Sequence, residues 1–361
     1  MKILIVSGYF YPQNTPRAFR TTELSKCFCS LGHEVVVYIP KVEYDFSFFL
    51  DKYPINICQY NTYKCKKVFC GISLFDKILF RILNQFLAYP YSLNLKPLMR
   101  ALKNETGYDL LISIAMPHSV HWAIGKLYEK GVKAANCWVA DCGDPFMLSQ
   151  TNSFRWPIYF KPLETRWCRQ CNYISVPTEK SIGGYYPEFK GKIRVIPQGF
   201  DFSEIKRKEY VNNLVPTFAY SGSLIPGKRD LRPILDLLIK KNTDFVLHIY
   251  TQQKSMFVTY KEQLGGKIQL HDYIPRIELL ESLSSMDFLL NLDNGITVQT
   301  PSKLIDYALT GRPILSLNSC DINEQLLDFF MKGDYSGQYV VENVEQYNIK
   351  NVAQQFLDLC I

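Results

Sequence analysis

Apolar residues along the chain form short, almost wholly apolar runs, separated by longer segments in which they recur at helical spacing. The short runs predict buried strands and the longer segments predict helices, and their alternation is typical of a parallel sheet covered by helices. The first predicted unit is strand 2–7, helix 21–30 and strand 35–39. The strands predicted further along begin at residue 108 and span 133–139, 173–177, 192–196, 217–221, 245–251, 267–271 and 287–292.

The pattern restarts in the second half of the chain, after a polar and charged segment without clear periodicity. A chain of 361 residues is long for one core and sufficient for two. We therefore predict an α/β protein with two Rossmann-like domains facing across a cleft (GT-B), residues 1–200 and 216–361, joined by a linker at 201–215. Ligands of parallel sheets bind at the carboxyl ends of the strands, so the loops that follow the strands are the candidate sites.

Segment 74–87 predicts a helix with apolar residues around most of its circumference and with Lys77 and Arg81 one turn apart. Two interpretations are open. The helix is either buried between the domains, or it lies at a membrane interface with its basic residues toward anionic headgroups. No segment of the sequence approaches the length of a membrane span. The second interpretation predicts a cytoplasmic protein that is peripheral at the inner face of the membrane.

The net charge of +7 predicts a basic surface, which suits nucleic acid, an anionic membrane surface or phosphorylated small molecules. The basic residues cluster near predicted helix starts instead of forming a continuous stripe, which argues against nucleic acid as a partner. Eleven cysteines without a repeating spacing indicate reduced thiols in a cytoplasmic protein. We expect no metal site and no cofactor.

The last strand, helix and strand of the second half carry the strongest chemical signal. Thr300, Pro301 and Ser302 form a helix start, in which a hydroxyl accepts from free backbone N–H groups and the proline ring has a helical φ. Lys303 adds a full charge to the N–H groups of the first turn, so this helix start predicts an anion site. Asp306, one turn further, is placed to accept from a sugar hydroxyl. The same residues also fit a helix cap without a ligand.

Two loops that follow strands of the second half carry residues for the same site. Lys228 and Arg229 crowd the loop after strand 217–221, where they face the helix start if the two loops lie on neighbouring strands. A basic turn exposed to solvent is the alternative interpretation. Tyr273 and Ile274, in the loop after the third strand of this half, are placed to offer backbone groups to a nucleobase.

Arg17 and Arg20 lie three residues apart near the start of the first helix. A positive charge near the amino end of a helix is opposed by the helix dipole. An anion held between the two arginines would account for their position, and a pair of solvated arginines is the alternative.

Four polar residues follow the ends of two strands of the first half. His118 and His121 follow the strand that begins at residue 108, where catalytic side chains of parallel sheets occur. Asp141 and Asp144 follow strand 133–139, and we predict that they accept a proton or a hydrogen bond from a hydroxyl. For either histidine, a purely structural position is the alternative.

Taken together, in this order and spacing, the motifs resemble the GT-B glycosyltransferases, specifically the family 4-like group. The resemblance covers nearly the whole chain. The motifs are YFYPQNTPRAFR and LGHEVVVY at the beginning, then WVADCGDPF, ISVPTE and IRVIPQGFD, and in the second half YSGSLIPGKRD, HDYIPRIELLESLSSMDFLL and PSKLIDYALTGRPIL.

The resemblance implies transfer of a sugar from a nucleotide diphosphate donor, held mainly by the second domain, to an acceptor held mainly by the first. It further implies that no divalent metal is needed and that the anomeric configuration is retained. Lys228 and Arg229 match the family's basic pair that neutralises the donor diphosphate. Asp306 matches the second glutamate of a two-glutamate signature, which binds hydroxyls of the ribose or sugar. Asp144 matches an acceptor-side position, and Arg17 lies in the loop that closes over the donor.

Two positions depart from the family pattern. The first glutamate of the signature would stand at Val298 and is absent. Ser223 stands directly after Gly222, where the family has arginine. The phosphate contacts then depend on Lys228, Arg229 and the helix start. These departures motivate one alternative, a non-catalytic scaffold with a degenerate donor site.

We predict a glycosyltransferase of cell-surface glycan biosynthesis, with a nucleotide sugar and a glycan or lipid-linked acceptor as partners. A nucleotide-sugar epimerase or hydrolase of the same fold is the second alternative. The predicted catalytic residues are His118, His121, Asp144, Lys228 and Arg229. The predicted donor-binding residues are Arg17, Gly222, Ser223, Lys228, Arg229, Tyr273, Ile274, Thr300, Pro301, Ser302, Lys303 and Asp306. The predicted acceptor-binding residues are Arg20, Asp141 and Asp144.

Overall fold

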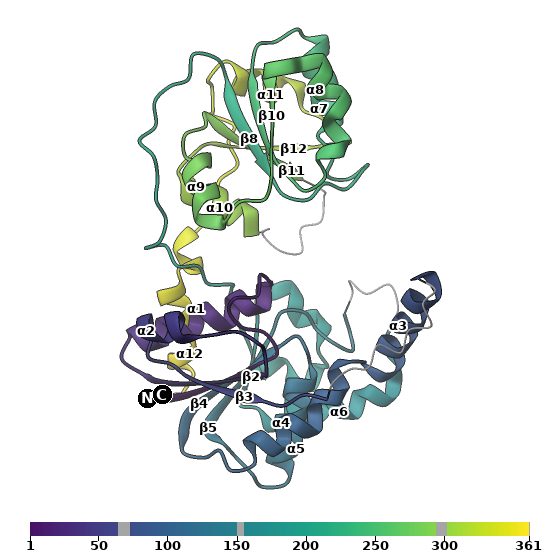
Figure 1. Ribbon diagram of the computed structural model, residues 1–361, viewed down its shortest axis with the longest axis vertical. Helices are drawn as coiled ribbons and strands as arrows, with labels where there is room; N and C mark the ends of the chain where they lie inside the picture. The colour runs from purple at the N-terminus through teal and green to yellow at the C-terminus, as the bar shows by residue number, and fades with distance from the viewer. Residues whose placement is uncertain (64–72, 150–154, 294–301, 361) are drawn as a thin grey trace. The chain divides into compact units, whose positions relative to one another are not determined.

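The structure, a computed structural model, describes residues 1–63, 73–149, 155–293 and 302–360. They form two compact units (Figure 1). Domain 1 comprises Met1–Phe200 and Gln346–Ile361, and domain 2 comprises Asp201–Glu345. The chain therefore crosses into domain 2 after residue 200 and returns to domain 1 for its last helix.

Domain 1 is built on seven parallel strands: β1 (Lys2–Ser7), β2 (Glu34–Pro40), β3 (Asn56–Tyr60), β4 (Tyr108–Ala115), β5 (Ala135–Cys142), β6 (Tyr173–Val176) and β7 (Ile193–Val195). Their order in the sheet is β3-β2-β1-β4-β5-β6-β7. Ile3 of β1 lies opposite Val35 of β2 and Leu110 of β4. The apolar runs of this half occur as strands because a parallel sheet with helices on both faces buries both sets of side chains. β3 lacks such a run and was not predicted.

The helices of domain 1 are α1 (Pro16–Ser30), α2 (Ser47–Lys52), α3 (Ser73–Leu87), α4 (Leu95–Leu102), α5 (Ser119–Glu129), α6 (Lys161–Gln170) and α12 (Ile349–Asp358). Alternate strand residues point to opposite faces of the sheet, and each face has its own apolar core. Ile3 and Ile5 lie in the core with α1, α2 and α12, whereas Leu4 and Val6 lie in the core with α4, α5 and α6. Figure 1 shows these two groups of helices on opposite sides of the sheet.

Helix α12 belongs to domain 1, although the sequence predicted residues 216–361 as the second domain. Ile349, Val352 and Phe356 are buried in the same core as β1. The ring centre of Phe356 also lies 5.1 Å from the guanidinium carbon of Arg20. The predicted domain limit is therefore corrected for this helix, because its apolar side finds its partners on the first sheet.

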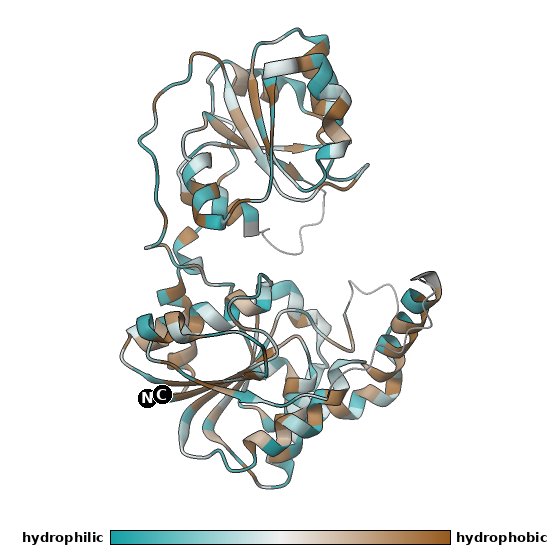
Figure 2. Ribbon diagram, viewed as in Figure 1, coloured by the Kyte–Doolittle hydropathy of each residue, from teal (hydrophilic) through white to brown (hydrophobic). Residues whose placement is uncertain are grey.

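Domain 2 contains a second parallel sheet, in the order β10-β9-β8-β11-β12. Its strands are β8 (Thr217–Ser221), β9 (Val246–Tyr250), β10 (Ile268–His271), β11 (Phe288–Asp293) and β12 (Ile314–Asn318). Its helices are α7 (Arg232–Lys240), α8 (Val258–Leu264), α9 (Arg276–Leu283), α10 (Ser302–Thr310) and α11 (Glu324–Met331). Figure 2 shows largely apolar strands beside helices that carry both apolar and polar residues, as expected for helices covering a sheet.

The predicted linker, residues 201–215, lies along domain 2. Arg207 Nε donates to the Leu309 carbonyl over 2.8 Å, and the Tyr210 hydroxyl donates to Asp287 over 2.6 Å. These contacts place the segment within the second compact unit, although its sequence has no regular pattern.

Helix α3 presents apolar residues at the surface of domain 1. The exposed ones, between 39% and 56% accessible, are Phe75, Ile78, Phe80, Ile82, Phe86 and Leu87. Lys77 and Arg81 are also exposed. In the described part of the chain, no helix has the length and apolar character needed to span a membrane.

Replacing Phe356 by alanine should destabilise domain 1, because the ring is fully buried. We expect a loss of about 3–5 kcal/mol in the free energy of unfolding, measured with denaturant. Hydrogen exchange should rise in β1 and β4 and stay unchanged in β8 and β11. Phe330→Ala, which removes an equally buried ring from the core of domain 2, should give the reverse pattern. Faster exchange in the domain 2 strands of Phe356→Ala would contradict the assignment of α12.

Candidate functional site

Helix α10 begins beside the carboxyl end of β8. The Tyr307 hydroxyl accepts from the Ser221 N–H over 2.8 Å and lies 3.3 Å from the Ser221 Oγ. Gly222 follows with a φ of +130°, which residues with a side chain rarely adopt. A Cβ at Gly222 would lie 4.0 Å from Cδ of Lys303. The structure thus brings together the predicted helix start and the predicted loop after β8.

Lys303 brings a buried ammonium group to the beginning of α10. Its Nζ is buried, has no hydrogen-bond partner among the described residues, and lies 4.5 Å from the centre of the Tyr220 ring. The Tyr220 hydroxyl donates to the Ser223 carbonyl over 2.9 Å, which fixes this ring. Burial, and then the charge of Arg229, lowers the pKa of Lys303 to about 7. Arg229 Nε is likewise buried and unpaired within the described part of the chain. Two neighbouring cations, which have no carboxylate partner among the described residues, suit an anion.

The loop that carries Arg229 is held through its backbone. The Arg229 N–H donates to the carbonyl four residues earlier over 2.8 Å, and Ser319 Oγ donates to the Lys228 carbonyl over 3.1 Å. Asp230 neutralises Arg232, with 2.6 Å between the charged atoms. Lys228 is exposed and forms no ion pair among the described residues. The unpaired positive charge of this loop therefore comes from Lys228 and Arg229.

Asp306 is oriented by an arginine that the sequence analysis missed. Arg276 Nε and Nη2 both donate to Asp306 Oδ1, over 2.8 and 2.6 Å. Burial raises the pKa of Asp306, and Arg276 opposes this effect. Oδ2 has no hydrogen-bond partner among the described residues and is left to accept from a ligand hydroxyl. Tyr273, which is 64% exposed, and Ile274 lie in the loop that leads to Arg276. The sequence signal that could have identified this partner of Asp306 is the position of Arg276 directly after the loop.

Some residues of the predicted donor site are not described by the structure. Thr300 and Pro301 lie outside the described residues, and so does Val298. The backbone of Ser302 begins α10, whereas its side chain is not among those described. The donor site is thus defined here by Gly222, the loop after β8, and the first turns of α10.

Arg20 and Asp141 form a buried ion pair in domain 1. Arg20 Nη2 donates to Asp141 Oδ1 over 2.8 Å, and Ser175 Oγ donates to the same oxygen over 2.7 Å. Burial alone would raise the pKa of Asp141, but the charges of Arg20 and Arg17 hold it below its ordinary value. Both Arg20 and Asp141 are 2% exposed. The predicted acceptor contact is therefore corrected for these two residues, because each is enclosed and already paired with the other.

Arg17, His118 and Asp144 lie together near the ends of β4 and β5. The guanidinium group of Arg17 lies against Gly143, where a Cβ would be 2.5 Å from its central carbon. Arg17 Nη1 is 3.5 Å from Asp141 Oδ2. Burial, and then the charge of Arg17, lowers the pKa of His118 to about 4, so its ring is neutral near pH 7. Asp144 is exposed. Arg17 belongs to domain 1, whereas the other residues of the predicted donor site belong to domain 2.

His121 is part of the core and not of a site. Its Nδ1 lies 2.8 Å from Ser113 Oγ and its Nε2 lies 3.3 Å from Cys142 Sγ. Trp138 Nε1 donates to the same Ser113 Oγ over 2.7 Å. The residue is fully buried, and burial holds the pKa of His121 well below its ordinary value. The predicted catalytic role of His121 is corrected, because its side chain points from α5 toward the sheet, where Ser113 of β4 and Cys142 of β5 enclose it.

A pocket of about 230 Å³, here called pocket A, lies in domain 1 and is lined by His118, Trp122, Asp144, Phe146 and Trp156, among others. The rings of Phe146 and Trp156 stack with their centres 4.4 Å apart. His118 Nδ1 and Trp122 Nε1 are buried and have no hydrogen-bond partner among the described residues. Unpaired polar atoms, a carboxylate and aromatic faces together suit a hydroxylated ligand.

Glu164, on α6, positions the loop that carries Asp144, and the sequence analysis missed it. Its Oε1 accepts from the Met147 N–H over 3.2 Å, and the side chain is fully buried. Burial raises the pKa of Glu164 to about 7. Nothing in the local sequence distinguishes this glutamate from a surface one, since its partner is a backbone group.

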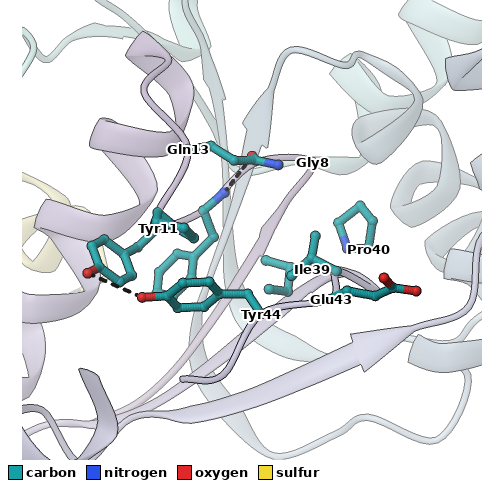
Figure 3. A pocket seen from close by; sticks show the side chains of 10 residues that line it. Gly8, Tyr11, Gln13, Ile39, Pro40, Glu43 and Tyr44 are labelled. Atoms are coloured by element: carbon teal, nitrogen blue, oxygen red, sulfur yellow. Dashed lines mark hydrogen bonds between the residues drawn. The ribbon is translucent and has the colours of Figure 1, made fainter. Parts of the chain in front are cut away.

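A second pocket, of about 210 Å³ and here called pocket B, lies where β1 and β2 end, and Figure 3 shows it from close by. It is lined by Gly8, Tyr11, Gln13, Pro40, Glu43 and Tyr44, among others. The sequence analysis covered the first of its loops only for Arg17 and Arg20, and assigned nothing to the second. Within the described residues, no three His, Cys, Asp or Glu side chains are arranged to hold a metal ion.

Comparison with protein-family models and with curated protein sequences gives no match. Solved structures match over almost the whole chain. The apo form of the lipopolysaccharide outer core galactosyltransferase WaaB matches 99% of this chain and 99% of its own, with a TM-score of 0.60 and 12% identity. A glycosyltransferase from Rickettsia africae matches 99% of this chain and 97% of its own, with a TM-score of 0.63 and 13% identity.

Anabaena HepE in complex with UDP and glucose matches 99% of this chain and 98% of its own, with a TM-score of 0.58 and 10% identity. At such identities the similarity concerns the fold. The predicted fold class is confirmed: the chain has two Rossmann-like domains and the GT-B fold of these glycosyltransferases.

Replacing Lys303 by methionine should stabilise the ligand-free protein. In the folded state the pKa of Lys303 is about 7, well below its ordinary value of 10.5. The unfolded chain therefore binds more protons between these two values, and the free energy of unfolding rises with pH across this window. Below pH 7 the full cost of the buried charge is present. We expect Lys303→Met to add about 1–3 kcal/mol in urea denaturation at about pH 6 and less at about pH 9.

Lys228→Met is the matched control, because Lys228 belongs to the same group of cations but is exposed. It should change the free energy of unfolding little at either pH. A gain for Lys303→Met that does not depend on pH would contradict the buried, titrating lysine.

Proposed function

We propose that the protein transfers a sugar from a nucleotide diphosphate sugar to a polysaccharide or glycolipid acceptor in cell-surface glycan assembly. The observation that carries this proposal is a pair of buried cationic atoms, Lys303 Nζ in α10 and Arg229 Nε in the loop after β8, which have no hydrogen-bond partner among the described residues. The GT-B fold supports it, as do HepE, which has been solved with UDP and glucose, and WaaB, a galactosyltransferase.

The donor side is domain 2. A diphosphate between Lys303 and Arg229 would supply the negative charge that both cations lack, with the N–H groups of the first turn of α10 as further donors. Asp306 Oδ2 would accept from a hydroxyl of the ribose or the sugar. When the bond to the sugar breaks, negative charge grows on the leaving oxygen of the diphosphate. Fixed cations there stabilise the transition state more than the ground state, and so accelerate the transfer.

The acceptor side is domain 1, with pocket A. His118 is neutral, so it would act there by a hydrogen bond to a hydroxyl and not through charge. Asp144 is an exposed carboxylate and would accept a hydrogen bond from the acceptor hydroxyl that attacks the sugar. We extend the proposal to retention of the anomeric configuration. We extend it also to transfer without a divalent metal, because two protein cations already neutralise the diphosphate; transfer should then proceed in the presence of EDTA.

Binding of a nucleoside diphosphate should weaken as the pH rises through 7. Only protonated Lys303 binds the anion, and its pKa is about 7 in the free protein. The dissociation constant should be about tenfold larger near pH 8 than near pH 6, measured by calorimetry with a panel of nucleoside diphosphates. Lys303→Arg, which stays charged, should bind with little dependence on pH. Lys303→Met should lose most of the binding.

Turnover assays separate the alternatives. Consumption of a nucleotide sugar without any acceptor, and without a glycosylated product when acceptors are supplied, would favour an epimerase or hydrolase. Absence of binding to every nucleotide in the folded protein would favour the scaffold and overturn the proposal. His118→Ala and Asp144→Asn should lower the transfer rate while leaving nucleotide binding unchanged, since both residues are in domain 1.

We propose further that α3 holds the protein at an anionic membrane surface, on the cytoplasmic side. The exposed Phe86 and Leu87 lie at the end of α3, and the Tyr159 hydroxyl donates to the Phe86 carbonyl. Ile158, beside it, is 80% exposed, so the apolar surface extends beyond the helix. The exposed charges of Lys77 and Arg81 suit anionic headgroups.

In flotation with vesicles, the protein should rise with anionic vesicles and not with zwitterionic ones. The double variant Ile78→Ser and Ile82→Ser should remain in the lower fraction, as should Lys77→Gln with Arg81→Gln. Val211→Ser with Leu214→Ser is the control, because these exposed apolar residues belong to domain 2, whereas α3 belongs to domain 1. Recovery of the α3 variants with the vesicles at the level of the wild type would contradict the membrane proposal.

A further inference from the structure

Pocket B has the composition of a sugar-binding site. We propose that it binds a neutral or amino sugar ring of the acceptor, one or more units away from the ring that reacts in pocket A. This inference rests on the proposed function and deepens it, because it makes the acceptor an oligosaccharide held at two places in domain 1.

Two tyrosine rings form one wall of pocket B. The rings of Tyr11 and Tyr44 meet edge to face with their centres 5.7 Å apart, and their hydroxyl oxygens are 3.4 Å apart. Tyr11 also stacks on Phe49 at 5.1 Å, and its N–H donates to Thr22 Oγ1 over 3.1 Å. The wall is therefore fixed before any ligand binds. Rigid aromatic faces with polar edges suit the C–H face and the hydroxyls of a pyranose ring.

The polar groups around these rings have unused hydrogen-bonding capacity. Gln13 Oε1 accepts weakly from the Phe10 N–H over 3.4 Å, which directs the amide. Its Nε2 has no partner in the described part of the chain and is left to donate. Glu43 is exposed and makes no hydrogen bond or ion pair among the described residues. Figure 3 shows the two tyrosines on one side of the pocket and the Glu43 carboxylate on the other. A ligand with several hydroxyls would use both groups.

The charge of pocket B disfavours a phosphate. Glu43 is the one charged residue among those that line it, in a protein with a net charge of +7. A nucleotide or an acidic sugar would bring like charges together here, which costs free energy without a compensating cation. A neutral sugar or an amino sugar brings no such repulsion. With about 210 Å³, the pocket is also below the ~300 Å³ from which sites for drug-sized ligands begin, and it suits a single ring.

Pockets A and B lie on either side of one close contact. Gly8, which follows β1, lines pocket B, and Pro117, which follows β4, lines pocket A. A Cβ on Gly8 would lie 2.2 Å from Cδ of Pro117, so only glycine permits the two loops to approach this closely. β1 and β4 are neighbours in the sheet, and both pockets therefore belong to the same edge of domain 1. A linear oligosaccharide with one ring in pocket A can reach pocket B across this contact.

Saturation-transfer NMR tests the inference with methyl glycosides of glucose, galactose, mannose, N-acetylglucosamine and glucosamine as probes. At least one should receive saturation from the wild-type protein. Tyr44→Ala and Gln13→Ala should each weaken that binding about fivefold to tenfold, since each removes one stacking or hydrogen-bonding contact. Methyl glucuronide should bind more weakly, and Glu43→Gln should remove this difference. Tyr339→Ala is the control and should have no effect, because Tyr339 is as exposed as Tyr44 but lies in domain 2.

The same samples are titrated with the nucleoside diphosphates. If nucleotides bind but no glycoside receives saturation, or if neither Tyr44→Ala nor Gln13→Ala weakens glycoside binding, the subsite is refuted and the donor proposal stands. If nucleotides fail to bind as well, the proposed function itself fails. Tyr44→Phe guards against loss of folding, because it keeps the ring and should retain binding within about twofold to threefold of the wild type.

Discussion

The main physical constraint on the candidate donor site of domain 2 is one buried cation, the ammonium group of Lys303. Removing this group from water without a counter-charge costs free energy, and its lowered pKa reflects that cost. The helix keeps the lysine there nonetheless, because Tyr307 joins α10 to the end of β8 and Asp306 joins it to Arg276 on α9. The ligand-free domain is therefore less stable than its packing alone would make it. An anion that neutralises the charge adds to stability as it binds, so affinity and stability are coupled at the same atom.

In domain 1, by contrast, the buried charges are paired with one another. Arg20 and Asp141 neutralise one another below the surface, and Arg17 lies within 3.5 Å of the same carboxylate. His118, which faces pocket A, is uncharged near pH 7 because burial and Arg17 both disfavour the imidazolium. The ion pair thus joins α1 to the end of β5, while the groups of pockets A and B available to a ligand are neutral or acidic. The two domains have similar sheets and opposite electrostatic character at their candidate sites.

The strands other than β3 could be predicted from the sequence because each contains a short apolar run, and this signal is local. The grouping of the β8 loop with the α10 start could be predicted too, since parallel strands end at one edge of their sheet. His121 could not be distinguished from His118, because the residues that enclose it, Ser113 and Cys142, come from other strands. Periodicity shows which side of a helix is apolar but not what covers it, so the return of α12 to domain 1 was missed. Pocket B was missed because two loops about thirty residues apart form it.

Opposite charges at the two candidate sites give each ligand one place to bind. A nucleotide diphosphate is attracted by the unpaired cations of domain 2 and repelled by Glu43 in pocket B. A neutral glycan gains nothing from Lys303, which needs an anion, and finds in domain 1 the aromatic faces and unpaired polar atoms that a hydroxylated ring requires. Discrimination of this kind comes as much from unfavourable contacts at the wrong site as from favourable ones at the right site. On the proposed function, the acceptor part bound in pocket B would carry no negative charge, and any phosphate of a lipid-linked acceptor would lie outside this pocket.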